Sequence, residues 1–227
     1  MPHITIVMPV LNEETSISAE LSCLQPLRQQ DCELIVVDGG SRDQTVALAK
    51  PLADRVIASP KGRAAQMNAG AALAQTSILW FLHADSLPLP DAAGIIRTAL
   101  SDPNRYWGRF DVRLSERHPL LRMVESLMNI RSRLTGIATG DQGIFVRREL
   151  FERVGGYPAL ALMEDIALSR LLKQYDRPVC LRQRLQTSSR RWERDGMLCT
   201  ILLMWRLRLA YFLGADPNQL AQIYYRP

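Results

Sequence analysis

The sequence predicts an α/β protein built on a doubly wound, mostly parallel sheet with helices on both faces. Several short apolar runs lack polar alternation, which is typical of strands covered on both sides. Helical patterns separate these runs, and the resulting βαβαβαβ order favours parallel pairing through right-handed crossovers. Past residue 100 the pattern changes to alternating polar and apolar residues, which predicts a smaller antiparallel portion.

Four strands are expected in the first hundred residues, at 4–8, 34–37, 56–58 and 78–82. Helices are expected near residues 15–27, 44–52, 63–74 and 91–100. Ser41 and Gln44 have the spacing of a capping box, which predicts where the second of these helices begins.

The second half is expected to contain strands at 108–114 and 143–148, and helices at 119–134 and 163–175. The chain then reaches a very apolar segment at 197–213. No internal repeat or linker separates the halves, so residues 1–227 are interpreted as one continuous domain.

Composition narrows the class of protein. The 227 residues are 47% hydrophobic and 22% charged, as in a folded globular protein, with a net charge of +5. Nearly all the cations are arginines, which suit phosphates and carboxylates, although a solvated basic face is an equal alternative. The four cysteines form no CxxC pair and no export signal precedes the first strand, so we expect free thiols in the cytoplasm.

Polar residues follow each of the four predicted strands. Parallel strands bring their carboxyl ends to one edge of the sheet, where ligands bind in such folds. Each residue alone has an ordinary explanation as a turn, a helix cap or a solvated charge. Their occurrence together favours a binding site, and in chain order they are Asn12 and Glu13, Asp38, Arg63 and Asn68, and Asp85.

The loop after the first strand excludes two common nucleotide sites. It reads "PVLNEETS" and contains no glycine, so neither a dinucleotide fingerprint nor a P-loop is present there. Bound phosphates would therefore need another source of positive charge. Magnesium binds a few carboxylates together with substrate phosphates, so Asp85 is predicted to hold a divalent metal (Mg²⁺ or Mn²⁺), aided by Arg63.

The order of these motifs resembles the family 2 glycosyltransferases, which have the GT-A fold. The resemblance runs through "IVMPVLNEE", "ELIVVDGGSRDQT", "GRAAQMNAG" and "WFLHADS", and continues in "TGDQGIFVRRELFERVGGYP", "MEDIALSRLL" and "SSRRWERDG". It implies a single GT-A domain in which residues 1–100 bind the nucleotide sugar and 101–190 the acceptor. Residues 191–227 would form an apolar helical tail.

The resemblance also implies roles for individual residues. Pro9, Leu11 and Glu13 would line the nucleoside pocket, Asp38 would accept a hydrogen bond from the base, and Arg63 would approach the base or phosphates. Ala84 and Asp85 occupy the place of the DxD motif, with Asp85 as metal ligand. His83 replaces the first acid and is interpreted as a pocket or core residue, because imidazole suits magnesium poorly.

On the acceptor side the same resemblance makes Asp165 the general base of an inverting transfer. A helix N-terminus is the ordinary explanation for the neighbouring acids Glu164 and Asp165. Asp141, Glu164, Arg191 and Trp192 would contact the acceptor. Ser188 stands where processive synthases of the family have glutamine, which argues against a processive polysaccharide synthase.

The function expected from these residues is transfer of a sugar from a nucleoside diphosphate sugar to an acceptor hydroxyl or carboxyl. A UDP-sugar is the donor that we favour. The acceptor could be a lipid or isoprenoid, because arginines precede the apolar tail and such segments rest on anionic membranes. Core packing or a dimer interface is the alternative for this tail, which is too short and too charged to span a bilayer. We expect a cytoplasmic protein, peripheral on the inner face of the cell membrane if the tail binds lipid, and no nucleic-acid partner.

Two other functions fit parts of the pattern. A metal-dependent nucleotidyltransferase could use the same sheet and aspartate, but it should have a loop rich in glycine and arginine after the first strand. A non-catalytic membrane- or partner-binding module with a vestigial sugar-nucleotide site would explain His83 in place of an acid. The presence of Glu13, Asp38, Asp85 and Asp165 argues against such decay.

Overall fold

The computed structural model describes residues 3–225, apart from the side chains of Arg191, Glu193 and Arg194. Within that range one mixed sheet contains strands β1 (Ile4–Val10), β2 (Cys32–Asp38), β3 (Arg55–Ala58), β4 (Ile78–Phe81), β5 (Ser86–Leu87), β6 (Trp107–Leu114), β7 (Phe145–Arg147) and β8 (Val179–Thr187). Their spatial order is β3-β2-β1-β4-β7-β6-β8-β5.

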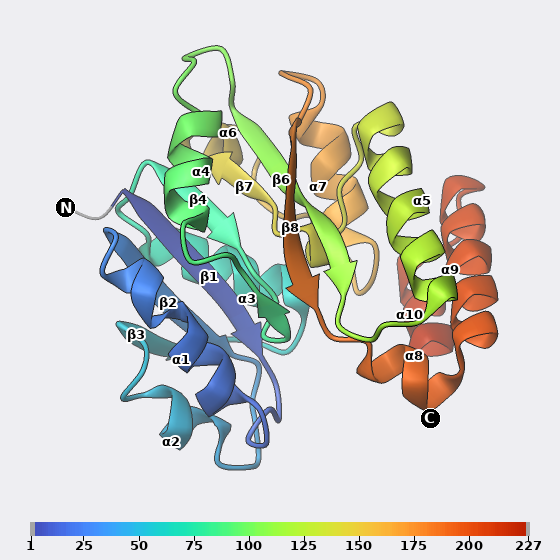
Figure 1. Cartoon of the computed structure of the whole chain (residues 1–227), viewed down its shortest axis with the longest axis horizontal. Coiled ribbons are helices and arrows are strands. Elements are labelled where there is room, and N and C mark those ends of the chain that lie inside the picture. The colour runs from blue at the N-terminus through green and yellow to red at the C-terminus, as the bar shows by residue number, and fades with distance from the viewer. Residues whose placement is uncertain (1–2, 226–227) are drawn as a thin grey trace.

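The helices are α1 (Ile17–Arg28), α2 (Thr45–Ala49), α3 (Arg63–Leu73), α4 (Ala92–Ala99), α5 (Pro119–Thr135), α6 (Arg148–Arg153), α7 (Glu164–Leu172), α8 (Arg190–Asp195), α9 (Met197–Phe212) and α10 (Pro217–Tyr224), with a 3₁₀ turn η1 (Gly140–Gln142). Figure 1 shows the blue N-terminal elements around β1–β3 on one side of the molecule and the red C-terminal helices on the other.

The sheet confirms the predicted α/β class with both a parallel and an antiparallel portion. Strands β1, β2, β3 and β4 pair in parallel, whereas β4 with β7, β7 with β6 and β8 with β5 are antiparallel. The chain winds outward from β1 to β3 and then returns to β4 on the other side of β1. This reversal leaves a crevice at the carboxyl ends of β1 and β4.

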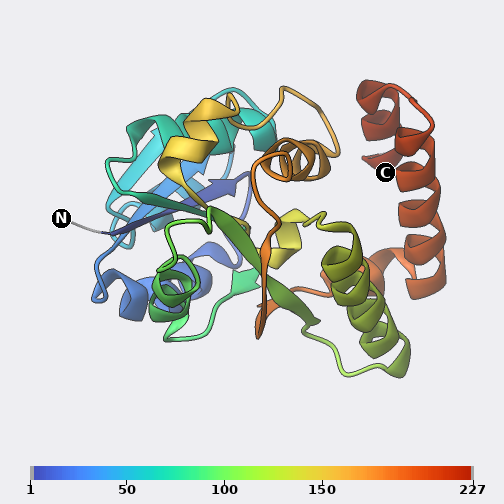
Figure 2. The same ribbon diagram turned by 90° about the horizontal axis from the view of Figure 1, so that it is seen from above.

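Helices cover both faces of the sheet (Figure 2). Alternate residues of a strand point to opposite faces. In β1 the side chains of Ile4, Ile6 and Met8 belong to a core formed with α1 and α4, while Val7 belongs to the core formed with α3, α6 and α7. Burial on both faces explains why these strands show unbroken apolar runs in the sequence.

The tail packs against the acceptor half through one face. Leu207 of α9 and Leu220 of α10 are buried together with Ile166 of α7. The start of α9 also packs on α5, where Ile201 lies against a cluster that contains Leu121 and Val124. Core packing therefore explains part of the apolar tail. No helix within residues 3–225 has the length and apolar character of a membrane span.

Some local predictions were wrong. The second helix begins at Thr45 and spans only five residues, and the capping box predicted for Ser41 and Gln44 does not form. Instead, the Ser41 hydroxyl accepts a hydrogen bond from the backbone N–H of Asn12, so it ties the loop after β2 to the loop after β1. The fourth strand ends at Phe81, and the short β5, the long β8 and the helix α6 were not expected.

Candidate active site

Asp85 lies in a corner of the sheet between β4 and β5. Pairing of β5 with the end of β8 fixes this corner, with Ser86 opposite Thr187. The backbone N–H of Ser188 donates to the carbonyl of Asp85 at 3.2 Å, and the Thr187 hydroxyl lies 3.5 Å from its carboxylate. Asp85 therefore lies where the chain, after the end of β4 at Phe81, turns to pair with β8.

Glu164 and Asp165 are the first residues of α7. The residue before them, Met163, has a φ of 67°, a left-handed conformation that side chains other than glycine seldom adopt. Such backbone strain concentrates at functional sites. One carboxylate oxygen of Asp165 accepts from the backbone N–H of Gly140 at 2.9 Å, and the other accepts from the N–H of Ile166 at 2.7 Å. Asp165 is therefore fixed against η1.

Asp141 enters the site on η1. This turn is closed by a capping box in which Thr139 and Gln142 exchange hydrogen bonds between side chain and backbone. Asp141 is half-exposed, and its Oδ1 lies 3.4 Å from Nδ1 of the buried His83. Burial raises the pKa of Asp141, but the hydrogen bond and charge of His83, followed by the charges of Arg63 and Arg208, bring it below its usual range.

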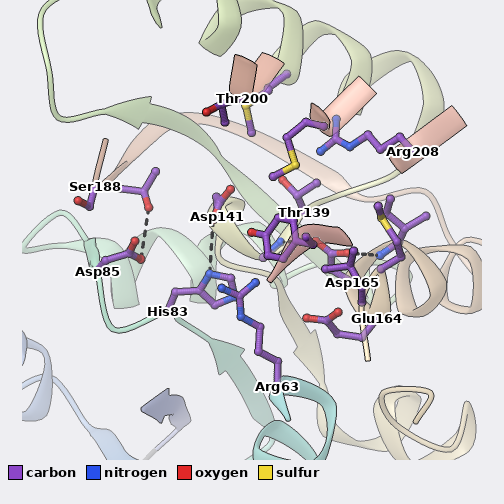
Figure 3. Close-up of a pocket in the computed structure, with 18 of the residues that line it drawn as sticks. Arg63, His83, Asp85, Thr139, Asp141, Glu164, Asp165, Ser188, Thr200 and Arg208 are labelled. Atoms are coloured by element: carbon purple, nitrogen blue, oxygen red, sulfur yellow. Dashed lines mark hydrogen bonds and ion pairs between the residues drawn. The ribbon is translucent and has the colours of Figure 1, made fainter. Parts of the chain in front are cut away.

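A cavity of about 240 Å³ joins these elements (Figure 3). Arg63 reaches into it from α3 on one side, and Arg208 reaches in from α9 on the other. The wall also contains four acids that sequence analysis assigned to the site, namely Asp85, Asp141, Glu164 and Asp165. Segments far apart in the sequence thus bring the predicted donor-side and acceptor-side acids into one pocket.

Two of the pocket acids, Glu164 and Asp85, resist ionisation. Burial, followed by the charge of Asp165, holds the pKa of Glu164 well above its usual range. Burial also raises the pKa of Asp85, and the negative charge of Asp141 adds to that rise while His83 opposes it. A pocket with this surplus of buried carboxylates favours the entry of a cation.

A second cavity of about 310 Å³ meets the first at Asp85, Thr187 and Ser188. Arg190 and Glu20 line it. The guanidinium of Arg190 lies 3.7 Å from Glu20 and 3.8 Å from Glu13, so the predicted pocket residue Glu13 faces this side. Burial raises the pKa of Glu20 to about 7, and the Arg190 charge only partly opposes that rise.

The other residues predicted for the nucleoside lie deeper in the same edge. Pro9 is within β1, Leu11 directly follows it, and Ala84 is buried beside Asp85. The carboxylate of Asp38 accepts hydrogen bonds from the N–H groups of Gly40 and Ser41 at 3.1 Å. Asp38 therefore stabilises the loop that follows it. The four residues predicted for the nucleoside lie outside the lining of the first cavity, namely Pro9, Leu11, Asp38 and Ala84.

Sequence analysis missed the contribution of the tail. Trp192, which was predicted to contact the acceptor, lines the cavity, and the side chain of Arg191 lies outside the described residues. Thr200, Met204 and Arg208 of α9 complete the wall together with Tyr224 of α10. Their spacing of four residues places the three α9 side chains on one helical face, which a helical projection of the apolar segment would have revealed.

Gln66 is a second residue that sequence analysis overlooked. Its buried side-chain amide donates to the carbonyls of Val10 and Val37, at the carboxyl ends of β1 and β2. It therefore holds together the two strand ends that carry Asn12, Glu13 and Asp38. The "GRAAQMNAG" motif contains this glutamine, but nothing in its spacing indicated that it would cross-link two strands.

The metal predicted at Asp85 is compatible with the residues present. No group of three or more His, Cys, Asp or Glu side chains within residues 3–225 is arranged to hold a metal ion. Magnesium nevertheless needs only one or two carboxylates when substrate phosphates supply other ligands. Asp85, with its elevated pKa and with Asp141 nearby, fits a cation that arrives together with a diphosphate.

Comparison with known proteins gives a consistent result. Residues 5–155 match the family model described as glycosyl transferase family 2. An uncharacterized glycosyltransferase of Haemophilus influenzae is 36% identical in an alignment of 93 residues, and the match covers 37% of this chain and 37% of that protein. The sequence match thus spans well under two thirds of that relative.

Three solved structures resemble the fold. S. aureus TarS 1–349 has a TM-score of 0.67 at 15% identity, covering 82% of this chain and 60% of that one. A Pyrobaculum calidifontis mannosyltransferase in complex with GDP-Man and Mn²⁺ also reaches 0.67, at 22% identity, covering 99% and 70%. Glucosyl-3-phosphoglycerate synthase from Mycobacterium tuberculosis, with Mn²⁺, UDP and product, reaches 0.62 at 20% identity, covering 82% and 71%. These likenesses identify the predicted GT-A fold.

Proposed function

The chain belongs to the family 2 glycosyltransferases, and from that premise we propose that it transfers a sugar from a nucleoside diphosphate sugar to an acceptor with inversion at the anomeric carbon. The observation that carries this proposal is the shared pocket of Asp85, Arg63 and Asp165. A diphosphate-binding acid and a candidate base face one space, as transfer between two substrates requires.

Arg63 and Asp85 would bind the donor diphosphate in this proposal. Arg63 contributes a guanidinium at the first residue of α3, and Asp85 would hold a divalent ion, Mg²⁺ or Mn²⁺. Such an ion stabilises negative charge on a departing diphosphate. The M. tuberculosis and P. calidifontis structures contain Mn²⁺ with UDP and with GDP-Man respectively, which supports a nucleotide sugar as donor. Among nucleotide sugars, we propose a UDP-sugar as the preferred donor.

Asp165 would accept the proton of the acceptor hydroxyl. Hydrogen bonds from Gly140 and Ile166 fix its carboxylate at the pocket wall, which is what a positioned base requires. A carboxyl acceptor would already be ionised and would need no base. Glu164 is more deeply buried and, because its pKa is raised, binds a proton more tightly than an ordinary glutamate. We assign Glu164, Asp141 and Trp192 to acceptor contacts.

The outer face of α9 supports a peripheral membrane contact. Leu198, Leu202, Trp205 and Leu209 are each more than 60% exposed and recur at helical spacing, so they form one apolar stripe. Arg206 is also exposed on this helix, as in helices that rest on anionic lipid. The enzyme would thus work on the inner face of the cell membrane, with a lipid or isoprenoid acceptor entering beside the stripe.

Ligand-induced stabilisation tests the proposal against its alternatives. The melting temperature is measured with UDP, GDP, dTDP and NAD, with and without Mn²⁺. A rise with one nucleoside diphosphate that depends on the metal, and that is lost in Asp85→Asn, supports the transferase. A nucleotidyltransferase should instead respond to nucleoside triphosphates, and an absence of any response would favour a non-catalytic binding module.

A further inference from the structure

The acceptor end of the pocket contains a cation, Arg208, that makes no direct hydrogen bond or ion pair within the described part of the chain. Arg208 is half-buried and lines the cavity. Among the described residues no hydrogen bond or ion pair reaches its guanidinium, although its positive charge helps to lower the pKa of Asp141. A guanidinium has five N–H donors, so an enclosed one ordinarily binds carboxylates or backbone carbonyls. Its donors are available to a ligand.

A second arginine lies close to Arg208 and is also unsatisfied. Nε and Nη2 of Arg131, on α5, are buried and lack hydrogen-bond partners within the described structure. Burial, followed by the charge of Arg208, lowers the pKa of Arg131 to about 10. Two like charges held together in a partly buried site are unfavourable unless an anion lies near both.

The acids of the pocket do not supply that anion. Asp165 is the acid whose charge favours ionised Arg131, yet its two oxygens already accept from Gly140 and Ile166. Asp141 lies against His83. Among the described residues no carboxylate therefore pairs directly with either guanidinium, although Asp165 and Asp141 interact with Arg131 and Arg208 through their charges.

The position of Arg208 within α9 is not that of an ordinary solvated charge. Thr200, Met204 and Arg208 follow one another at four-residue intervals and all line the pocket. Arg206, two positions earlier, is exposed on the helix surface. The helix thus directs one arginine into the cavity and the other to solvent, and this provides a matched pair for an experiment.

We propose that the acceptor is anionic and that a phosphate or carboxylate group of it binds Arg208, with Arg131 behind, on the side of the pocket where Asp165 lies. This inference rests on the proposed function of the pocket. Arg63 enters from the opposite side, so the donor diphosphate and the acceptor anion would have separate cations (Figure 3). The planar guanidinium fork binds either anion in a bidentate manner.

Phosphate binding tests the proposal without knowledge of the sugar. Calorimetric titration with inorganic phosphate is compared in the wild type, Arg208→Gln, Arg131→Gln and the control Arg206→Gln. We expect Arg208→Gln to weaken phosphate binding about 10- to 100-fold, because charge-assisted hydrogen bonds are lost. Arg206→Gln should leave phosphate binding unchanged. Phosphate binding by Arg63→Gln shows whether inorganic phosphate binds at the proposed donor side instead. Weakening in Arg63→Gln with none in Arg208→Gln or Arg131→Gln would overturn the inference.

Further arms identify the source of the anion and separate the two proposals. Phosphatidylcholine vesicles with and without phosphatidic acid replace inorganic phosphate, and Arg208-dependent binding to phosphatidic acid alone would assign the anion to a lipid. Acetate is titrated in the same way as a carboxylate probe, and if none of the three probes binds in an Arg208-dependent manner, the anionic acceptor is wrong. Metal-dependent stabilisation by UDP or GDP is measured in the same proteins and should persist in Arg208→Gln. If this stabilisation is absent from the wild type and from every variant, the proposed transferase function is contradicted, while the proposed anion site is not.

Discussion

Nδ1 of His83 lies 3.4 Å from Oδ1 of Asp141, so a residue that follows β4 contacts an acid from a distant part of the chain. His83 follows β4 in the parallel portion, whereas Asp141 lies in η1, before β7 of the antiparallel portion. The contact joins the sides of the pocket that we propose for the donor and the acceptor. The family resemblance implies that His83 stands at the first acid of the DxD motif, and in that case Asp141 places a carboxylate near the position of the missing one.

The contact between His83 and Asp141 should require a glycine at position 140. A Cβ atom at position 140 would collide with Cε1 and Nε2 of His83. We expect Gly140→Ala to displace His83 and Asp141, to destabilise the protein by about 1–3 kcal/mol, as overpacking does, and to lower turnover. Urea denaturation and steady-state assays measure both effects.

Gly94→Ala is the matched control for this substitution. Gly94 lies within α4, where an added Cβ would meet nothing closer than Arg97 at 4.0 Å. Alanine there should be neutral or stabilise by about 0.5–1 kcal/mol, because glycine is a poor helix former. Equal effects at positions 94 and 140 would contradict the close packing of His83 against η1.

The parallel half of the fold was predictable because burial on both faces produces a local signal. β1, β2 and β4 contain buried, mainly apolar runs, and the loops after β3 and β4 supply Arg63 and Asp85 to the pocket. The capping box was predicted wrongly because a local spacing was taken to outweigh a tertiary contact. The hydroxyl of Ser41 bonds the chain at Asn12 instead.

The acceptor side was harder to predict because it is assembled from distant segments. Asp141 and Asp165 were identified through family motifs, but their contacts with His83 and with the N–H of Gly140 depend on how η1 meets α7. The tail was interpreted as one apolar surface. The structure divides it into a pocket face containing Arg208 and an exposed face containing Trp205, a division that overall hydrophobicity conceals.

Glu20 should make stability depend on pH. Its pKa is raised by burial from 4.5 to about 7, so the folded protein binds this proton more tightly than the unfolded chain. The free energy of unfolding should therefore fall as pH rises from 4.5 to 7, and the full cost should be present above pH 7. Glu20→Gln removes this ionisation and should stabilise the protein by about 1–3 kcal/mol at pH 8, with little effect at pH 4.

Thermal or urea unfolding across this pH range measures the difference between Glu20→Gln and the wild type. Glu116→Gln serves as control, because Glu116 is exposed and should show no comparable trend. A variant curve parallel to that of the wild type from pH 4 to pH 8 would show that the Glu20 carboxyl ionises as easily in the folded protein as in the unfolded chain.

The exposed stripe of α9 should determine membrane affinity. Trp205 is 61% exposed, and full burial of a large apolar side chain in lipid contributes about 1.5–3 kcal/mol. Trp205→Ser should therefore reduce co-sedimentation with anionic vesicles by about tenfold or more. Tyr175→Ser removes an exposed aromatic residue away from α9 and should leave binding unchanged. If the two variants bind alike, the stripe does not rest on lipid, and sedimentation velocity would show whether a second copy covers it.

Asp165 and Asp85 should separate catalysis from donor binding. If Asp165 is the base for a hydroxyl acceptor, Asp165→Asn should lower kcat by about 100- to 10,000-fold, because asparagine cannot accept the proton. Stabilisation by UDP or GDP with Mn²⁺ should survive. Asp85→Asn should instead abolish the metal-dependent part of that stabilisation as well as turnover. Near-normal transfer by Asp165→Asn would move the base elsewhere, with Glu164 the next acid to test. Survival of the metal effect in Asp85→Asn would place the ion on other ligands, because a neutral amide is a much weaker ligand for Mn²⁺ than the carboxylate it replaces.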